Sequence, residues 1–150
     1  MPKTRPTRVL HARNVTNGEL VQMVTKAAQL ATGRLSWPRG LDRNQAPRLI
    51  HEYLRRRVRY YAEPPHMQVV RLPSATVKQR VADCKSTAVF LVAALTAAGI
   101  PMALRFIKQR GRPTWSHVYA VRRDTGETFD PLLKYGQEAV YSQRKDVPIR

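Results

Sequence analysis

VADCKSTAVFLVAAL, residues 81–95, is the stretch that decides the fold of this chain. Asp83 is expected to cap a helix, because its carboxylate can accept from the free backbone N–H groups of the first turn. Cys84 would then hold the first helical position, where the helix dipole favours a negative charge such as a thiolate, and Lys85 acts in the same direction. No polar residue occurs from Ala88 to Leu95. The stretch therefore predicts a helix buried on most sides, with the chain's only cysteine at its N-terminal end.

The rest of the chain divides into helices before this stretch and strands after it. Apolar residues at helical spacing predict helices over residues 19–31 and 47–61, and Gly99 before Pro101 is expected to end the central helix. Strand-forming residues predict strands over 103–108, 115–122 and 127–130. Helices followed by an antiparallel meander indicate an α+β fold, with N-terminal helices and a central buried helix packed on a small antiparallel β-sheet.

The flanks of the chain are basic and have little periodicity. Residues 1–13 carry four basic residues and no acid, which predicts an N-terminal arm that is extended and disordered when alone. Residues 136–150 are expected to be a polar, basic C-terminal tail, so the folded domain is predicted to span residues 14–135. A single cysteine, no secretory signal and no apolar run of about 20 residues favour a cytoplasmic, reducing location without a membrane.

The net charge of +17 predicts contacts with anions. The basic residues are spread along the chain without a nucleic-acid-binding motif, so we expect an acidic protein or nucleic-acid surface to be held non-specifically through the basic arms. The arginines within 47–61 fit a solvated basic face better than a dedicated polyanion site, and both interpretations stay open. Four histidines and one cysteine at unrelated spacings predict no metal site, and no motif for a cofactor is present.

Three residues in order along the chain indicate cysteine chemistry. Cys84 lies at a helix end, His117 lies within a strand, and Asp130 closes the next strand. Nucleophilic catalysis by cysteine needs a thiolate, an imidazole that carries the proton and a third group that orients the imidazole. Each residue also has a simpler explanation: a small buried cysteine, a core histidine and an aspartate that caps a turn.

The spacing of the two strands raises a geometric difficulty for this triad. A two-residue turn at Thr125-Gly126 would place Asp130 opposite Val121, about 13 Å along the strand from His117. The triad therefore requires a turn nearer 122–125, or a bulge. The sequence leaves both alternatives open.

Several short motifs together resemble one family. They are Arg59-Tyr60-Tyr61 with Pro64-Pro65, Asp83-Cys84-Lys85, Ala97-Ala98-Gly99-Ile100-Pro101, Trp115-Ser116-His117-Val118-Tyr119 and Phe129-Asp130-Pro131. In this order, over about residues 45–135, they are similar to the transglutaminase-like superfamily of papain-like cysteine hydrolases. The nearest resemblance is to the small transglutaminase-like domain proteins of bacteriophages. The chain departs from the family in Lys85-Ser86, where many relatives carry an acid, and in Ala82, where relatives usually have glycine.

The resemblance implies a Cys84-His117-Asp130 triad acting on an amide or peptide bond of a protein or peptide substrate. By analogy with papain-like enzymes, an upstream side chain would help the Cys84 N–H stabilise the oxyanion, and Gln79 is the nearest candidate, although it could be a plain surface residue. Trp115 is expected in the core rather than at the cleft wall. The activity would be that of a cysteine peptidase, amidase or transamidase. The alternative is a structural, virion-associated protein that contacts neighbours in a phage particle through its basic arms.

Overall fold

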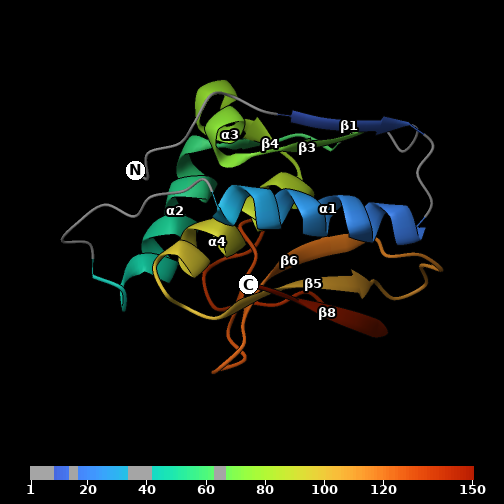
Figure 1. Ribbon diagram of the computed structural model, residues 1–150. Helices are drawn as coiled ribbons and strands as arrows, with labels where there is room; N and C mark the ends of the chain where they lie inside the picture. The colour runs from blue at the N-terminus through green and yellow to red at the C-terminus, as the bar shows by residue number, and fades with distance from the viewer. Residues whose placement is uncertain (1–8, 14–16, 34–41, 63–66) are drawn as a thin grey trace.

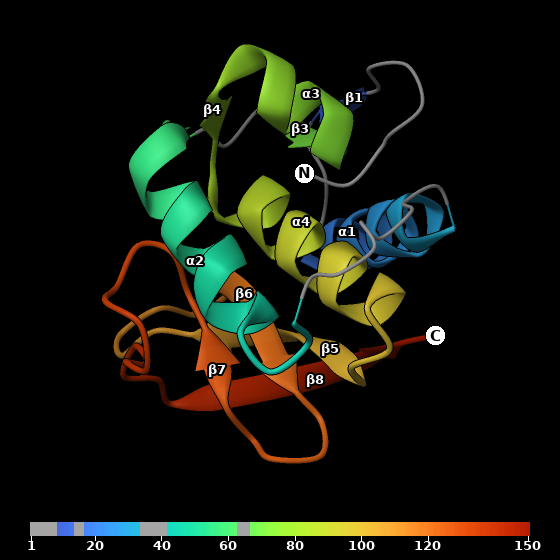
Figure 2. The same ribbon diagram turned by 90° about the vertical axis from the view of Figure 1, so that its left-hand side faces the viewer.

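The computed structural model of the chain describes residues 9–13, 17–33, 42–62 and 67–150. It is an α+β fold in which a central helix, α4 (Cys84–Ala97), lies between three other helices and a four-stranded antiparallel sheet (Figures 1 and 2). The other helices are α1 (Asn17–Thr32), α2 (Ala46–Arg57) and α3 (Pro73–Gln79). The predicted fold class, with a buried helix packed on a small antiparallel sheet, is confirmed.

Helix α4 is the centre of the hydrophobic core. Every residue from Ala88 to Leu95 is at most 1 % exposed, because α1, α2 and the sheet cover it on all sides. As predicted, Gly99 terminates the helix: α4 ends at Ala97, and Gly99 follows the C-cap residue Ala98 with a left-handed φ of 85°. The N–H of Gly99 donates to Thr96 O and that of Ile100 donates to Leu95 O, which satisfies two of the last free carbonyls.

The main sheet has the strand order β7-β6-β5-β8, with β5 (Met102–Lys108), β6 (His117–Arg122), β7 (Thr128–Phe129) and β8 (Gln143–Ile149). Strand β8 lies within residues 136–150, for which the sequence predicted only a polar, basic tail, and it pairs with β5 along its whole length. Only Val147 and Ile149 of β8 pack against the core. An edge strand that is mostly solvated needs few apolar residues, so the polar composition concealed it.

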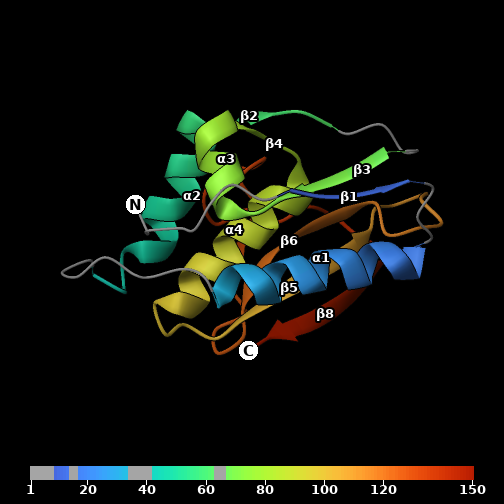
Figure 3. The same ribbon diagram turned by 45° about the horizontal axis from the view of Figure 1, so that its top comes forward.

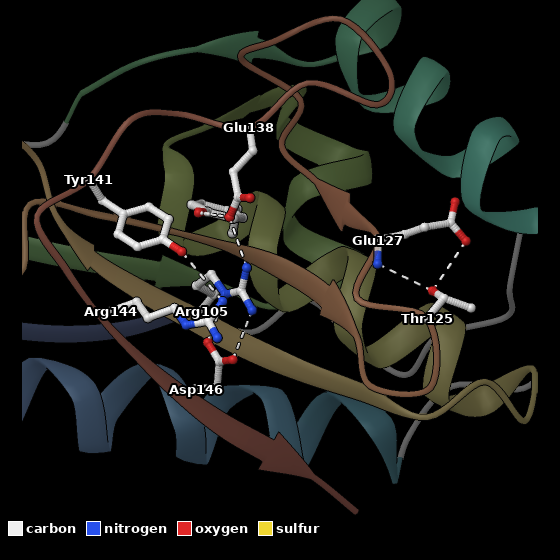
Figure 4. Close-up of polar contacts among 8 residues, drawn as sticks. Arg105, Thr125, Glu127, Glu138, Tyr141, Arg144 and Asp146 are labelled. Carbon is white, nitrogen blue, oxygen red and sulfur yellow. Dashed lines mark hydrogen bonds and ion pairs between the residues drawn. The ribbon is translucent and has the colours of Figure 1, made fainter.

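A partly buried ion network links the edge strand β8 to its neighbour β5 through their side chains (Figure 4). The guanidinium of Arg105 on β5 donates to both carboxylate oxygens of Asp146 on β8, at 2.8 and 2.9 Å. It also donates to Glu138 at 2.9 Å, and Glu138 accepts from the hydroxyl of Tyr119 on β6. The network therefore connects three strands of the sheet, β5, β6 and β8, with Glu138 in the segment between β7 and β8.

A second, two-stranded sheet pairs β1 (Val9–Arg13) with β3 (Met67–Arg71) in antiparallel register (Figure 3). Residues 9–13 of the predicted arm are extended, as expected, but they form a paired strand instead of being disordered, and residues 1–8 lie outside the described part. Backbone groups at the edge of β3 can pair with a strand whatever its side chains, so the basic composition of the arm does not prevent strand formation.

The predicted helix 47–61 is too long at its C-terminal end. Helix α2 ends at Arg57, and Val58 is extended, with φ −118° and ψ 122°. The chain then forms β2 (Arg59–Tyr60), which pairs in parallel with β4 (Val81–Ala82), immediately before α4. Parallel pairing supplies the backbone partners that a helix would otherwise provide, and it places Tyr60 beside Ala82, two residues from Cys84.

Within the described ranges, none of the helices has the length and apolar character needed to cross a membrane.

Candidate active site

The N-terminal end of α4 has the predicted cap. The carboxylate of Asp83 accepts from the backbone N–H of Ser86 at 3.2 Å, and Cys84 begins the helix with its side chain partly exposed. Lys85 is buried and its ammonium group pairs with the other carboxylate oxygen of Asp83. The charge of Lys85 is therefore largely balanced by Asp83, and the influence of Lys85 on the thiol is smaller than the sequence indicates.

The hairpin between β6 and β7 brings His117 and Asp130 together. Ala120 pairs with Phe129, so Asp130 follows directly at the position opposite Tyr119, the diagonal neighbour of His117. The turn is centred between Asp124 and Thr125, which is the first of the two alternatives that the triad required. Side chains at such diagonal positions are within reach of each other. The Nε2–H of His117 donates to the Asp130 carboxylate at 2.6 Å, and both residues are buried.

The ionisation of His117 links these two residues to Cys84. Burial alone lowers the pKa of His117, but the hydrogen bonds to Asp130 and then to Cys84 outweigh it and raise that pKa to about 10. Since Nε2 is bonded to Asp130, the ring presents Nδ1 to the sulfur. The raised pKa of His117 favours the protonated ring, which has the Asp130 carboxylate and Cys84 as its neighbours.

Helix α2 holds the backbone that carries Asp130. The Nε2–H of His51, which is fully buried, donates to the carbonyl of Asp130 at 3.1 Å. One turn later Arg55 donates to the carbonyl of Pro131 at 3.0 Å. Sequence reasoning missed both residues as site residues. Their i, i+4 spacing on one face of a helix is visible in the sequence. Their partners, however, are backbone carbonyls 79 and 76 residues further along the chain, which no local pattern indicates.

A cavity of about 310 Å³ opens over Cys84 and His117; we call it the thiol cleft. Its lining includes Tyr60, Gln68, Arg112 and Trp115 besides Cys84 and His117. Burial raises the pKa of Tyr60, and the neighbouring Cys84, Asp83 and Asp130 raise it further. Trp115 packs against the core, as expected, and it also lines the cleft, which was the less favoured of the two positions.

Gln79, the predicted side-chain donor to the oxyanion, does not lie at the thiol cleft. It ends α3, its side chain is exposed, and its Oε1 accepts from the Nε–H of Arg71 at 2.6 Å. Gln79 is not among the described residues that line the thiol cleft, whereas Gln68 of β3 is. Sequence distance from Cys84 favoured Gln79, but the sheet that pairs β3 with β1 places the more distant glutamine at the cleft.

No cluster of three or more metal-ligating side chains occurs among the described residues.

Comparison with known proteins gives a family but no individual relative. No curated protein and no solved structure matched the chain. A family model described as "Transglutaminase-like superfamily" matches residues 36–127, more than half of the chain and including Cys84 and His117. The matched range, the capped helix and the sheet beside it agree with each other, and the chain belongs to the transglutaminase-like superfamily.

Proposed function

We propose that the protein is a cysteine-dependent acyltransferase that cleaves amide or peptide bonds, with Cys84 as nucleophile, His117 as proton carrier and Asp130 as the residue that orients His117. The observation that carries this proposal is the buried His117, which is bonded to Asp130 at 2.6 Å and has a pKa raised to about 10 by Asp130 and Cys84. A cationic imidazole beside the sulfur favours a thiolate, which is the nucleophilic form of cysteine.

The first half of the proposed reaction forms a thioester. The Cys84 sulfur attacks the carbonyl carbon, and the charge that develops on oxygen faces the N–H groups at the start of α4. Tyr60 and Gln68 line the same cleft and are candidate side-chain donors to that oxygen. The C–N bond then breaks while His117 transfers its proton to the leaving amine. The products of this half are a free amine, an acyl-thioester and a neutral imidazole.

The second half returns the enzyme to its starting state. Water, for a peptidase or amidase, or a primary amine, for a transamidase, attacks the thioester and gives its proton to His117. The C–S bond breaks, and the thiolate–imidazolium pair is restored. Addition of monodansylcadaverine to a glutamine-containing peptide substrate separates the two outcomes, because only transamidation forms a fluorescent product.

The pH dependence of alkylation tests the proposal without a known substrate. Cys84 is the only cysteine, so iodoacetamide labelling reports on this residue alone. An ordinary thiol is only about 0.3 % thiolate at pH 6. We expect fast labelling at pH 6 in the native protein, and loss of that speed in His117→Ala and in the urea-unfolded chain. Slow labelling of the native protein, with the pH profile of an ordinary thiol, would refute the enzymatic proposal.

A second candidate is a structural component of an assembly such as a phage particle, in which the fold is a binding module. The net charge of +17 and the exposed Arg56 and Arg57 of α2 favour contacts with acidic neighbours. If the native protein and His117→Ala are labelled equally slowly at pH 6, this candidate replaces the enzyme.

A further inference from the structure

A second cavity, of about 300 Å³, adjoins the thiol cleft across Tyr60; we call it the arginine pocket. Tyr60 lines both cavities. The walls of the arginine pocket come from the end of α2, from Ala82 and Thr87 on either side of Cys84 in sequence, and from residues 131–132. The hydroxyl of Thr87 donates to the Cys84 carbonyl at 3.1 Å, so this wall is one helical turn from the nucleophile.

The lining of the arginine pocket is suited to a side chain that has a negatively charged end and an apolar stem. It includes Arg55 and Arg59, and no aspartate or glutamate is among the described residues that form it. One N–H of Arg55 donates to the Pro131 carbonyl, which fixes the side chain, and a guanidinium carries five such donors in a planar fork that matches a carboxylate. Leu54, Val58 and Leu132 supply the apolar part of the wall.

The position of the pocket relative to the thiol connects it to substrate binding. Thr87 of the arginine pocket is one helical turn, about 5.4 Å, from Cys84. An extended peptide advances about 3.3 Å per residue, so a chain that continues past Tyr60 would reach this pocket within two or three residues of the thiol. Tyr60 lies between the two cavities and is 46 % exposed. Its ring is therefore available to contact a peptide that passes from one cavity to the other.

We infer that the arginine pocket selects peptide substrates with an acidic side chain two or three residues to one side of the bond that Cys84 attacks. This inference rests on the proposed function and specifies its substrate class. Arg55 and Arg59 bind the carboxylate, and the apolar wall contacts the methylene groups of the same side chain. A glutamine at that position offers no negative charge to the guanidinium groups, so the pocket prefers glutamate.

Thiol-directed peptide reagents test the inference, because they need no known substrate. The probes are chloroacetyl-Glu-Glu-Glu-amide and chloroacetyl-Gln-Gln-Gln-amide, together with the same two tripeptides bearing a C-terminal chloromethyl ketone. The two reagent types extend the peptide in opposite directions from the sulfur. We expect the glutamate reagent of one type to alkylate Cys84 about tenfold faster than its glutamine partner at low salt, with a smaller ratio at high salt.

Variants then locate the selectivity. Arg55→Gln and Arg59→Gln should each reduce the Glu/Gln rate ratio several-fold. Arg56→Gln is the matched control, because Arg56 is a neighbouring exposed arginine that pairs with Glu52 and does not line the pocket; its ratio should equal that of the native protein. Arg112→Gln tests the basic residue of the thiol cleft itself. The inference is overturned by a ratio near one in the native protein, or by a ratio that only Arg112→Gln reduces.

Iodoacetamide labelling in parallel separates this inference from the proposed function. Fast iodoacetamide labelling with no Glu/Gln preference rejects the arginine pocket and leaves the triad intact. Slow iodoacetamide labelling rejects the triad, and the Glu/Gln ratio still reports on the pocket, because the reactivity of the thiol cancels in the ratio. Arg59→Gln keeps the test valid if Arg55→Gln disturbs the segment at Pro131, which Arg55 contacts.

Discussion

Replacing Asp130 by alanine should remove nearly all of the positive charge from His117 at pH 8. In the native protein burial lowers the pKa of His117, while the bonds to Asp130 and Cys84 raise it to about 10. The bond to Asp130 is 2.6 Å long and both groups are buried, so solvent cannot replace the lost carboxylate easily. In Asp130→Ala the cost of burial remains and the larger of the two compensating bonds is lost. We expect the pKa of His117 to fall to 6.5 or below, the ordinary value being 6.5.

This shift changes the charge state of the site almost completely. At pH 8 a group with a pKa of 10 is about 99 % protonated, whereas one with a pKa of 6.5 is about 3 % protonated. Asp130→Asn is the graded control, because an amide oxygen can still accept from Nε2–H without supplying a negative charge. The pKa of His117 in Asp130→Asn should therefore lie between those of the native protein and Asp130→Ala.

NMR titration of the histidine ring signals measures these values, and His117→Gln assigns the signal among the four histidines of the chain. The same shift predicts how stability depends on pH. Because folding raises the pKa of His117, its contribution to stability is complete below pH 6.5 and is lost as the pH rises to about 10. Asp130→Ala should lack most of that loss in urea unfolding. The reasoning is refuted if native His117 titrates near 6.5, or if the pKa stays near 10 in Asp130→Ala.

Two further predictions concern residues that support the site and the sheet. His51→Leu removes the donor to the Asp130 carbonyl, so the pKa of His117 should fall and labelling of Cys84 at pH 6 should slow several-fold; an unchanged pH profile in a folded variant would show that His51 only fills space. In the ion network, Asp146→Ala should cost about 3 kcal/mol in urea unfolding, because the buried Arg105 keeps its charge and loses two of its three bonds. Arg105→Met should cost about 1 kcal/mol, because Asp146 and Glu138 are about a third exposed and water can solvate them. The opposite order of the two values would contradict this explanation.

The sequence determined the parts of the fold that depend on neighbouring residues. The cap at Asp83, the position of Cys84 and the termination of α4 at Gly99 follow from interactions within one helical turn, so they were predictable and are confirmed. The period of the apolar residues also located α1 and the start of α2. These features require no knowledge of what the elements pack against.

Tertiary structure decided the features that depend on distant partners. The register of β6 with β7 sets Asp130 beside His117, and the sequence allowed a second register that would have kept them apart. The polar strand β8 exists because the edge of β5 supplies its backbone partners, and Tyr60 reaches the cleft because β2 pairs with β4 instead of continuing α2. Local sequence encodes caps and periodicity, whereas register and backbone partners depend on which segments the whole fold brings together.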